Sequence, residues 1–127
     1  MAACIGCACS LDLPPREDIE LSMQRADDKL KETMKDWECS WTRGVYFAGE
    51  IARWKLTGNA SVLSYMKSWA DRNDWAPCKA EDHGDPTYGD NQACTSTYLQ
   101  LFLHDPESHE IAHVKPTLDA FELQLSN

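Results

Sequence analysis

Two helical patterns joined by a very short turn constrain the fold of this chain more than any other feature. The run WTRGVYFAGEIARWKLTG, residues 41–58, is followed at once by NASVLSYMKSWADRNDW, residues 59–75. Gly58 suits the end of the first helix, because glycine readily adopts the left-handed conformation found there. Asn59 or Ser61 can cap the second helix. A connection this short predicts that the two helices fold back on each other as an antiparallel hairpin.

The first helix of this hairpin is apolar almost all round in its first half, at residues 45–48, and is therefore expected to be buried on several sides. Gly44 and Gly49 are spaced for the close approach of another helix, or simply for packing against tryptophan. The second helix has a single apolar stripe, formed by Leu63, Met66, Trp69 and Ala70. This pattern is typical of a helix with one face toward a core.

Three further segments have helical patterns. An apolar stripe at steps of three and four runs along the first, and the acidic residues 17, 18 and 20 suit its N-terminal end. Its members are Ile19, Met23, Ala26, Leu30, Met34 and Trp37. The second segment is YGDNQACTSTYLQLF, residues 88–102. The third segment is HEIAHVKPTLDAFELQLSN, residues 109–127. Its Pro116 predicts a short turn and then a helix that has this proline at its first position.

No segment shows strand-like alternation of useful length, so the predicted fold class is all-α, built of antiparallel helical hairpins. The domain prediction is a disordered or extended cysteine-rich N-terminus, residues 1–15, and a helical-hairpin domain, residues 16–127. Cys4, Cys7 and Cys9 crowd into the first of these, but without a second ligand cluster they are a weak zinc signal. Six cysteines in all permit disulfides without requiring them.

The overall charge limits the classes of partner. Twelve basic residues against 21 acidic ones give a net charge of -9, which argues against nucleic-acid binding. No apolar run is long enough to cross a bilayer. The N-terminal segment lacks a basic region and has too short an apolar stretch for a convincing signal peptide, which slightly favours a cytoplasmic over a secreted location.

A long loop, residues 76–89, leads to Asp90 at the start of a predicted helix. Loops of this length in a small domain tend to carry function. From its position alone, Asp90 is expected to be a helix cap. Core packing and a sugar contact are equally good interpretations of Trp41, whereas His83, His104, His109 and His113 are best explained as surface residues.

The order and spacing of these segments resemble the unsaturated rhamnogalacturonyl and unsaturated glucuronyl hydrolases of glycoside hydrolase families 105 and 88. Their W-T-x-G helix corresponds to residues 41–44, their TG(D/N) turn to residues 57–59, and their DDxxxxQxYLELY-type helix to residues 90–102. The resemblance covers roughly residues 20–127. It implies part of an (α/α)6 toroid, with about two and a half of six hairpins present.

The resemblance also implies a function. These enzymes remove an unsaturated uronic acid from the end of a pectin or glycosaminoglycan fragment by hydrating its vinyl ether, without metal or organic cofactor. In this chain it implies Asp90 as a catalytic carboxylate and Trp41, Tyr88 and Asn91 as substrate-binding residues. Two of these depart from the family pattern, which often has His at the position of Tyr88 and a second Asp at that of Asn91.

The general acid/base Asp of the family belongs to a later W-x-D-(A/G)-L-(F/Y)-M motif, which this sequence does not contain. The chain is therefore expected to be a fragment that is inactive alone, with exposed helix faces that favour self-association. One alternative is a catalytically inactive helical-hairpin protein that binds acidic carbohydrate or a protein partner. Another is a helical scaffold with an N-terminal thiol-rich metal or redox site.

Overall fold

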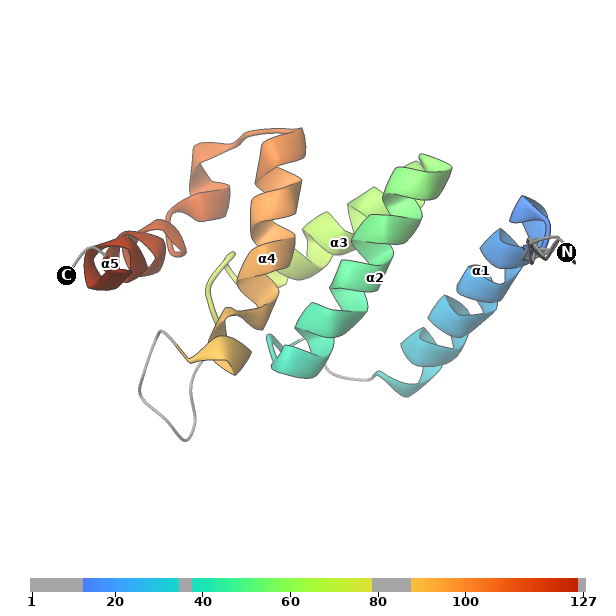
Figure 1. Cartoon of the computed structure of the whole chain (residues 1–127), viewed down its shortest axis with the longest axis horizontal. Helices are drawn as coiled ribbons and strands as arrows, with labels where there is room; N and C mark the ends of the chain where they lie inside the picture. The colour runs from blue at the N-terminus through green and yellow to red at the C-terminus, as the bar shows by residue number, and fades with distance from the viewer. Residues whose placement is uncertain (1–12, 35–37, 79–87, 126–127) are drawn as a thin grey trace, which may run out of the picture.

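The computed structural model describes residues 13–34, 38–78 and 88–125. It contains α1 (Arg16–Thr33), α2 (Trp41–Thr57), α3 (Ala60–Arg72), α4 (Gly89–His104), the short 3-10 helix η1 (Ser108–Ile111) and α5 (Lys115–Leu125) (Figure 1). The described ranges contain no strand, which confirms the all-α prediction. Within them, no helix combines the length and apolar character needed to cross a membrane. The N-terminal cysteines, Trp37 and His83 lie outside the described residues.

The structure confirms the predicted hairpin, including the residues that form its turn. Gly58 ends α2 in the left-handed region with φ 66°, and its N–H donates to the carbonyl of Trp54 at 2.7 Å. The side-chain oxygen of Asn59 then accepts from the backbone N–H of Ser61 at 2.9 Å and caps α3. Of the two predicted caps, Asn59 is the one used.

Helices α1, α2 and α4 stand side by side, and α2 and α4 run in the same direction, so that their N-terminal ends lie at one end of the molecule (Figure 1). A column of aromatic rings joins α2, α3 and α4. Phe47 stacks on Trp69 with ring centroids 4.0 Å apart, and Trp69 stacks on Tyr98 at 5.1 Å. All three rings are fully buried, as are Met66 and Leu101 around them.

Helices α2 and α4 approach each other closely at Gly44 in α2. A Cβ atom at this position would lie 2.6 Å from the backbone carbonyl group of Ala93 in α4, nearer than two atoms can come without a shift. No comparable constraint acts on Gly49, whose Cβ would meet no atom within 4 Å. Of the two glycines noted in the sequence, Gly44 therefore sets how closely the starts of α2 and α4 approach.

Helix α1 differs from its prediction. Its apolar stripe does not form a buried face, because Ile19 and Leu30 are 38% and 43% exposed. The buried residue of α1 is the polar Asp27, which accepts hydrogen bonds from Arg53 at 2.5 Å and from Tyr46 at 2.6 Å. α1 is thus attached to α2 through a charged cluster rather than through its apolar stripe.

The charged cluster has a defined ionisation pattern. Arg53 also pairs with Glu50 at 3.1 Å, and Lys31 pairs with Asp27 at 2.8 Å. Burial opposes ionisation of Asp27, but its hydrogen bonds from Lys31, Tyr46 and Arg53 prevail and lower its pKa. Burial, with the charge of Asp27 nearby, raises the pKa of Glu50.

The C-terminal part follows the predicted order with a small difference. After α4, η1 and a turn at residues 112–114 precede α5. Pro116 is the second residue of α5, not its first as predicted. Proline is tolerated there, since the first N–H groups of a helix have no partner within it.

Candidate functional site

A cavity of about 510 Å³ lies where the N-terminal ends of α2 and α4 meet the chain that leaves α3. It contains two of the predicted site residues, Trp41 and Asp90, which are 49 positions apart in the sequence. The described residues that line it are Glu38, Cys39, Ser40, Trp41, Arg72, Asn73, Asp74, Ala76, Pro77, Cys78 and Asp90. The parallel course of α2 and α4 brings these two residues together, because it places both helix starts at the same end of the fold (Figure 1).

Trp41 is held at the cavity by the start of its helix. Ser40 caps α2 by accepting a hydrogen bond from the backbone N–H of Arg43 at 3.3 Å, which makes Trp41 the first helical residue. Its side chain is 54% exposed. Core packing, one of the two interpretations left open by the sequence, does not describe this residue, whereas Trp69 and Trp75 are buried in the core.

Asp90 does not cap its helix. The cap position of α4 is occupied by Tyr88, which makes no side-chain capping bond, and Asp90 is the second residue within the helix. The expectation that Asp90 is a cap is therefore wrong, although a carboxylate in the first turn still faces the positive end of the helix dipole. Its side chain is exposed and lines the cavity.

The cavity lining includes Asp74, which lies in a turn that was not predicted from the sequence. Asp74 and Trp75 have φ values of 52° and 53°, in the left-handed region that side chains other than glycine rarely adopt. Such residues cost roughly 1–3 kcal/mol each and persist where their surroundings hold them. Burial and a 2.8 Å hydrogen bond from its indole N–H to Asp71 hold Trp75. The pair Asn73-Asp74 is the sequence signal that could have predicted this turn, since asparagine and aspartate tolerate the left-handed conformation.

Asn73 fastens this turn to the start of α2. Its side-chain oxygen accepts from the backbone N–H of Cys39 at 2.9 Å, and its side-chain nitrogen donates to the carbonyl of Trp69 at 2.9 Å. The segment that carries Trp41 and the segment that follows α3 are therefore linked directly. The shape of the cavity depends on this amide bridge as well as on helix packing.

The cavity is acidic. Glu38, Asp74 and Asp90 contribute carboxyl groups, and Arg72 is the one basic side chain among the described residues that line it. Carboxylates accept hydrogen bonds from hydroxyl groups, and an exposed indole offers an apolar face. This combination can hold a hydroxyl-rich molecule with apolar C–H faces, such as a sugar.

The other two predicted binding residues are not placed at the cavity. Tyr88 is exposed just before α4 and does not line it. For Asn91 the structure describes only the backbone, as the third residue of α4. The roles of both residues remain predictions.

The structure also gathers three cysteines that are far apart in the sequence. Cys39 and Cys78 line the cavity, and Cys94 is buried beneath it on α4. Their sulfur atoms all lie within 4.8 Å of one another. No spacing rule for helices or metal motifs could have found this cluster, because its members come from three separate segments.

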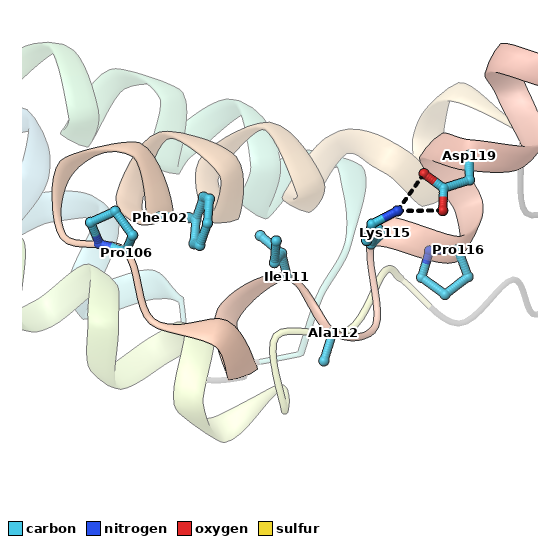
Figure 2. A pocket seen from close by; sticks show the side chains of 7 residues that line it. All are labelled: Phe102, Pro106, Ile111, Ala112, Lys115, Pro116 and Asp119. Atoms are coloured by element: carbon cyan, nitrogen blue, oxygen red, sulfur yellow. Dashed lines mark hydrogen bonds and ion pairs between the residues drawn. The ribbon is translucent and has the colours of Figure 1, made fainter.

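A second hollow of about 550 Å³ lies between the end of α4, η1 and the start of α5. Figure 2 shows Phe102 and Ile111 on one side of it and Lys115 reaching Asp119, to which it is ion-paired at 2.6 Å. None of the predicted site residues lines this hollow. The cavity beside Trp41 and Asp90 is therefore the candidate site.

Comparison with known protein families identifies the family to which the chain belongs. The profile of glycosyl hydrolase family 88 matches residues 17–125. The chain belongs to glycosyl hydrolase family 88. This confirms the resemblance inferred from the W-T-x-G helix, the T-G-N turn and the helix that starts near Asp90. Among functionally curated proteins, no sequence matches the chain.

Solved structures agree with the assignment to family 88. A family 88 glycosyl hydrolase from Bacteroides vulgatus is 28% identical with a TM-score of 0.68, and a polysaccharide lyase is 23% identical with a TM-score of 0.72. Each likeness covers 87% of this chain and 34% of the other, so the chain spans about a third of the length of these proteins. Its antiparallel hairpins form part of the six-hairpin (α/α)6 toroid, as predicted. The likeness to the lyase shows the fold alone.

Proposed function

We propose that the cavity beside Trp41 and Asp90 is part of a sugar site that holds an unsaturated uronic acid at the end of an oligosaccharide, from pectin rhamnogalacturonan or a related polymer. The observation that carries the proposal is the pairing of an exposed indole with a carboxylate at the N-terminal ends of two neighbouring helices. Membership of family 88 supports oligosaccharides as the class of ligand. The specific sugar comes from the motif resemblance and is the part that experiment must test.

In this proposal Trp41 covers an apolar face of the sugar ring. Asp90 and the neighbouring carboxylates accept hydrogen bonds from its hydroxyl groups. The guanidinium of Arg72 is the group of the described cavity lining whose charge complements the carboxylate of a uronic acid. The site thus offers a complementary group for each chemical part of the ligand.

The chemistry expected of the site is hydration of the C4=C5 vinyl ether. A carboxyl group donates a proton to C4, water adds at C5, and the resulting hemiketal collapses and releases the glycosidic bond. The acid must hold its proton near neutral pH, which a second carboxylate close by favours by raising its pKa. We assign Asp90 the role of this second carboxylate.

The acid itself belongs to the W-x-D-(A/G)-L-(F/Y)-M motif, which the printed sequence does not contain. We therefore expect this chain alone to bind the sugar without turning it over. Turnover of an unsaturated disaccharide can be followed as loss of the absorbance of its C=C bond. If this chain alone turns the disaccharide over and Asp90→Asn abolishes the turnover, a proton donor is already present. Binding without turnover also fits the alternative of an inactive carbohydrate-binding protein, so the site itself must be tested through binding.

The test is a titration of the chain with an unsaturated pectin disaccharide, measured by calorimetry. Trp41→Ala should weaken binding about fivefold to thirtyfold, since loss of one stacked ring is worth roughly 1–2 kcal/mol. Asp90→Asn should weaken it about threefold to tenfold, because the amide loses the charge-assisted hydrogen bond.

The controls lie on α2 and at the residue that follows α4. Val45→Ala removes an exposed side chain one turn after Trp41, and Asp105→Asn alters a carboxylate at the far end of α4. Neither residue lines the cavity, so both variants should bind like the unaltered chain. Equal weakening by Val45→Ala and Trp41→Ala would refute the assignment of the cavity.

A further inference from the structure

The three-cysteine cluster beneath the cavity wall has a chemistry of its own. Cys39 precedes α2, Cys78 follows α3, and Cys94 lies in the second turn of α4, so the fold alone brings them together. Cys94 is fully buried, and its sulfur lies 3.5 Å from the backbone carbonyl of Ser40, to which a thiol can donate. Cys39 and Cys78 are partly buried at the cavity.

Cys39 is the shared member of the cluster. Both Cys78 and Cys94 lie within disulfide reach of it. The corresponding Cα atoms lie 4.9 and 6.2 Å apart, and both separations are within the range of about 4.4–6.8 Å that disulfides span. A sulfur atom forms one disulfide bond at a time, so the oxidised cluster holds one disulfide and one remaining thiol.

The remaining thiol lies next to the disulfide. The sulfurs of Cys78 and Cys94 are only 3.2 Å apart, so whichever of them is not bonded to Cys39 lies beside the disulfide. Disulfides isomerise when a thiolate attacks one of their sulfur atoms, and proximity of this kind removes the need for a diffusional encounter.

We propose that Cys39, Cys78 and Cys94 form a thiol–disulfide exchange centre in which Cys39 is bonded in turn to each of the other two. The Cys94 thiolate attacks the Cys39 sulfur, a Cys39–Cys94 bond forms, and the Cys39–Cys78 bond breaks. Cys78 leaves as a thiolate and takes up a proton equal to the one that Cys94 released. The exchange is electron-neutral. Formation of the first disulfide transfers two electrons and two protons to an oxidant, for which a small disulfide such as oxidised glutathione suffices.

The two disulfide isomers join different segments around the cavity. Cys39 adjoins the Ser40 cap and Trp41, so a bond to Cys78 ties the start of α2 to the segment after α3. A bond to Cys94 ties it instead to α4, one turn beyond Asp90. The exchange centre therefore determines whether the segment that carries Cys39 and Trp41 is covalently joined to the chain after α3 or to α4. This inference does not depend on the proposed sugar substrate.

Peptide mapping tests the proposal on the full chain. Cleavage after Lys and Arg, except before Pro116, separates the three cysteines into the peptides 36–43, 73–79 and 80–127, and leaves the N-terminal cysteines in 1–16. The chain is equilibrated with reduced and oxidised glutathione, and free thiols are blocked with N-ethylmaleimide under acidic conditions. It is then digested without reductant for mass spectrometry. We expect both cross-linked pairs, 36–43 with 73–79 and 36–43 with 80–127, in one sample.

Single variants separate the isomers. Cys94→Ser should leave only the Cys39–Cys78 pair, and Cys78→Ser only the Cys39–Cys94 pair. The map of the unaltered chain decides the proposal even if a variant fails to fold. A single invariant pair, a Cys78–Cys94 bond, or three blocked thiols would overturn it. So would one zinc ion per chain that protects all three thiols from N-ethylmaleimide when zinc is supplied, since this would show a metal site instead.

Discussion

At the scale of single residues, the chain combines side chains that hold the fold together with side chains that face the cavity. Asp27 belongs to the first group, because it is buried on α1 and accepts hydrogen bonds from Tyr46, Arg53 and Lys31. Trp41 and Asp90 belong to the second group, since both are exposed and line the same cavity. The polar Asp27 thus stabilises the contact between α1 and α2, whereas the large aromatic Trp41 of α2 is available for binding.

Asp27→Asn should lower the free energy of unfolding by about 3 kcal/mol at pH 7, because it removes one partner of a buried charged cluster. The pKa of Asp27 is lowered in the folded chain. Its contribution is therefore present above the ordinary value of 3.8 and is lost as the pH falls through the lower folded value. Urea unfolding at several pH values should show the difference between the two chains shrinking below about pH 4.

The neighbouring Asp28 supplies a matched control for this measurement, since its side chain is exposed on the same helix. Asp28→Asn should change the free energy of unfolding by less than about 0.5 kcal/mol. A difference between the unaltered chain and Asp27→Asn that stays constant from pH 7 to pH 2 would show that the ionisation of Asp27 contributes nothing.

At the scale of helices, the contact between α2 and α4 positions the candidate site. The backbone of Ala93 passes so close to Gly44 that no side chain fits between the two helices. This contact lies three residues beyond both Trp41 and Asp90, near the starts of their helices. The glycine of the W-T-x-G motif therefore has a geometric role in bringing the two site residues together.

Gly44→Ala should destabilise the chain by about 1–3 kcal/mol, since the added methyl group forces the two backbones apart. Gly49→Ala, in the same helix but in open space, should stabilise it by about 0.5–1 kcal/mol, because alanine is the better helix former. Thermal unfolding of both variants measures the difference. Equal shifts in the same direction would contradict the assigned contact.

Several helix features could be predicted because they depend on local sequence. The end of α2 at Gly58, the cap at Asn59 and the hairpin between α2 and α3 all follow from residues close in the chain. The packing of α1 could not be predicted, because the stripe of Ile19 and Leu30 has the period of a buried face, while the polar Asp27 is the residue with partners on α2. Periodicity shows which residues share a face of a helix and does not show what that face contacts.

At the scale of the whole molecule, the described helices form part of a six-hairpin toroid and expose apolar side chains on α1. The exposed residues of this helix include Ile19, Leu21 and Leu30, and Leu13 is exposed just before it.

The candidate site could likewise be predicted only where its residues belong to a local motif. Its candidates Trp41 and Asp90 came from motifs, whereas the cysteine cluster arises from contacts between distant segments and could not be predicted.

We propose that the exposed apolar face of α1 makes the chain self-associate. Sedimentation equilibrium should show an average mass that rises with concentration, and more steeply at high salt, because salt screens the repulsion between chains of net charge -9. The double variant Ile19→Gln and Leu30→Gln should reduce the effect. A constant monomer mass at all concentrations and salt levels would contradict this prediction.

If Trp41 faces a sugar, its indole N–H signal must respond when the sugar binds. The signals of the five tryptophans can be assigned by single substitutions and followed by nuclear magnetic resonance while an unsaturated pectin disaccharide is added. We expect the Trp41 signal to shift with ligand concentration while those of Trp54 and the buried Trp69 stay in place. A shift of Trp54 without Trp41, or no shift at saturating disaccharide, would contradict it.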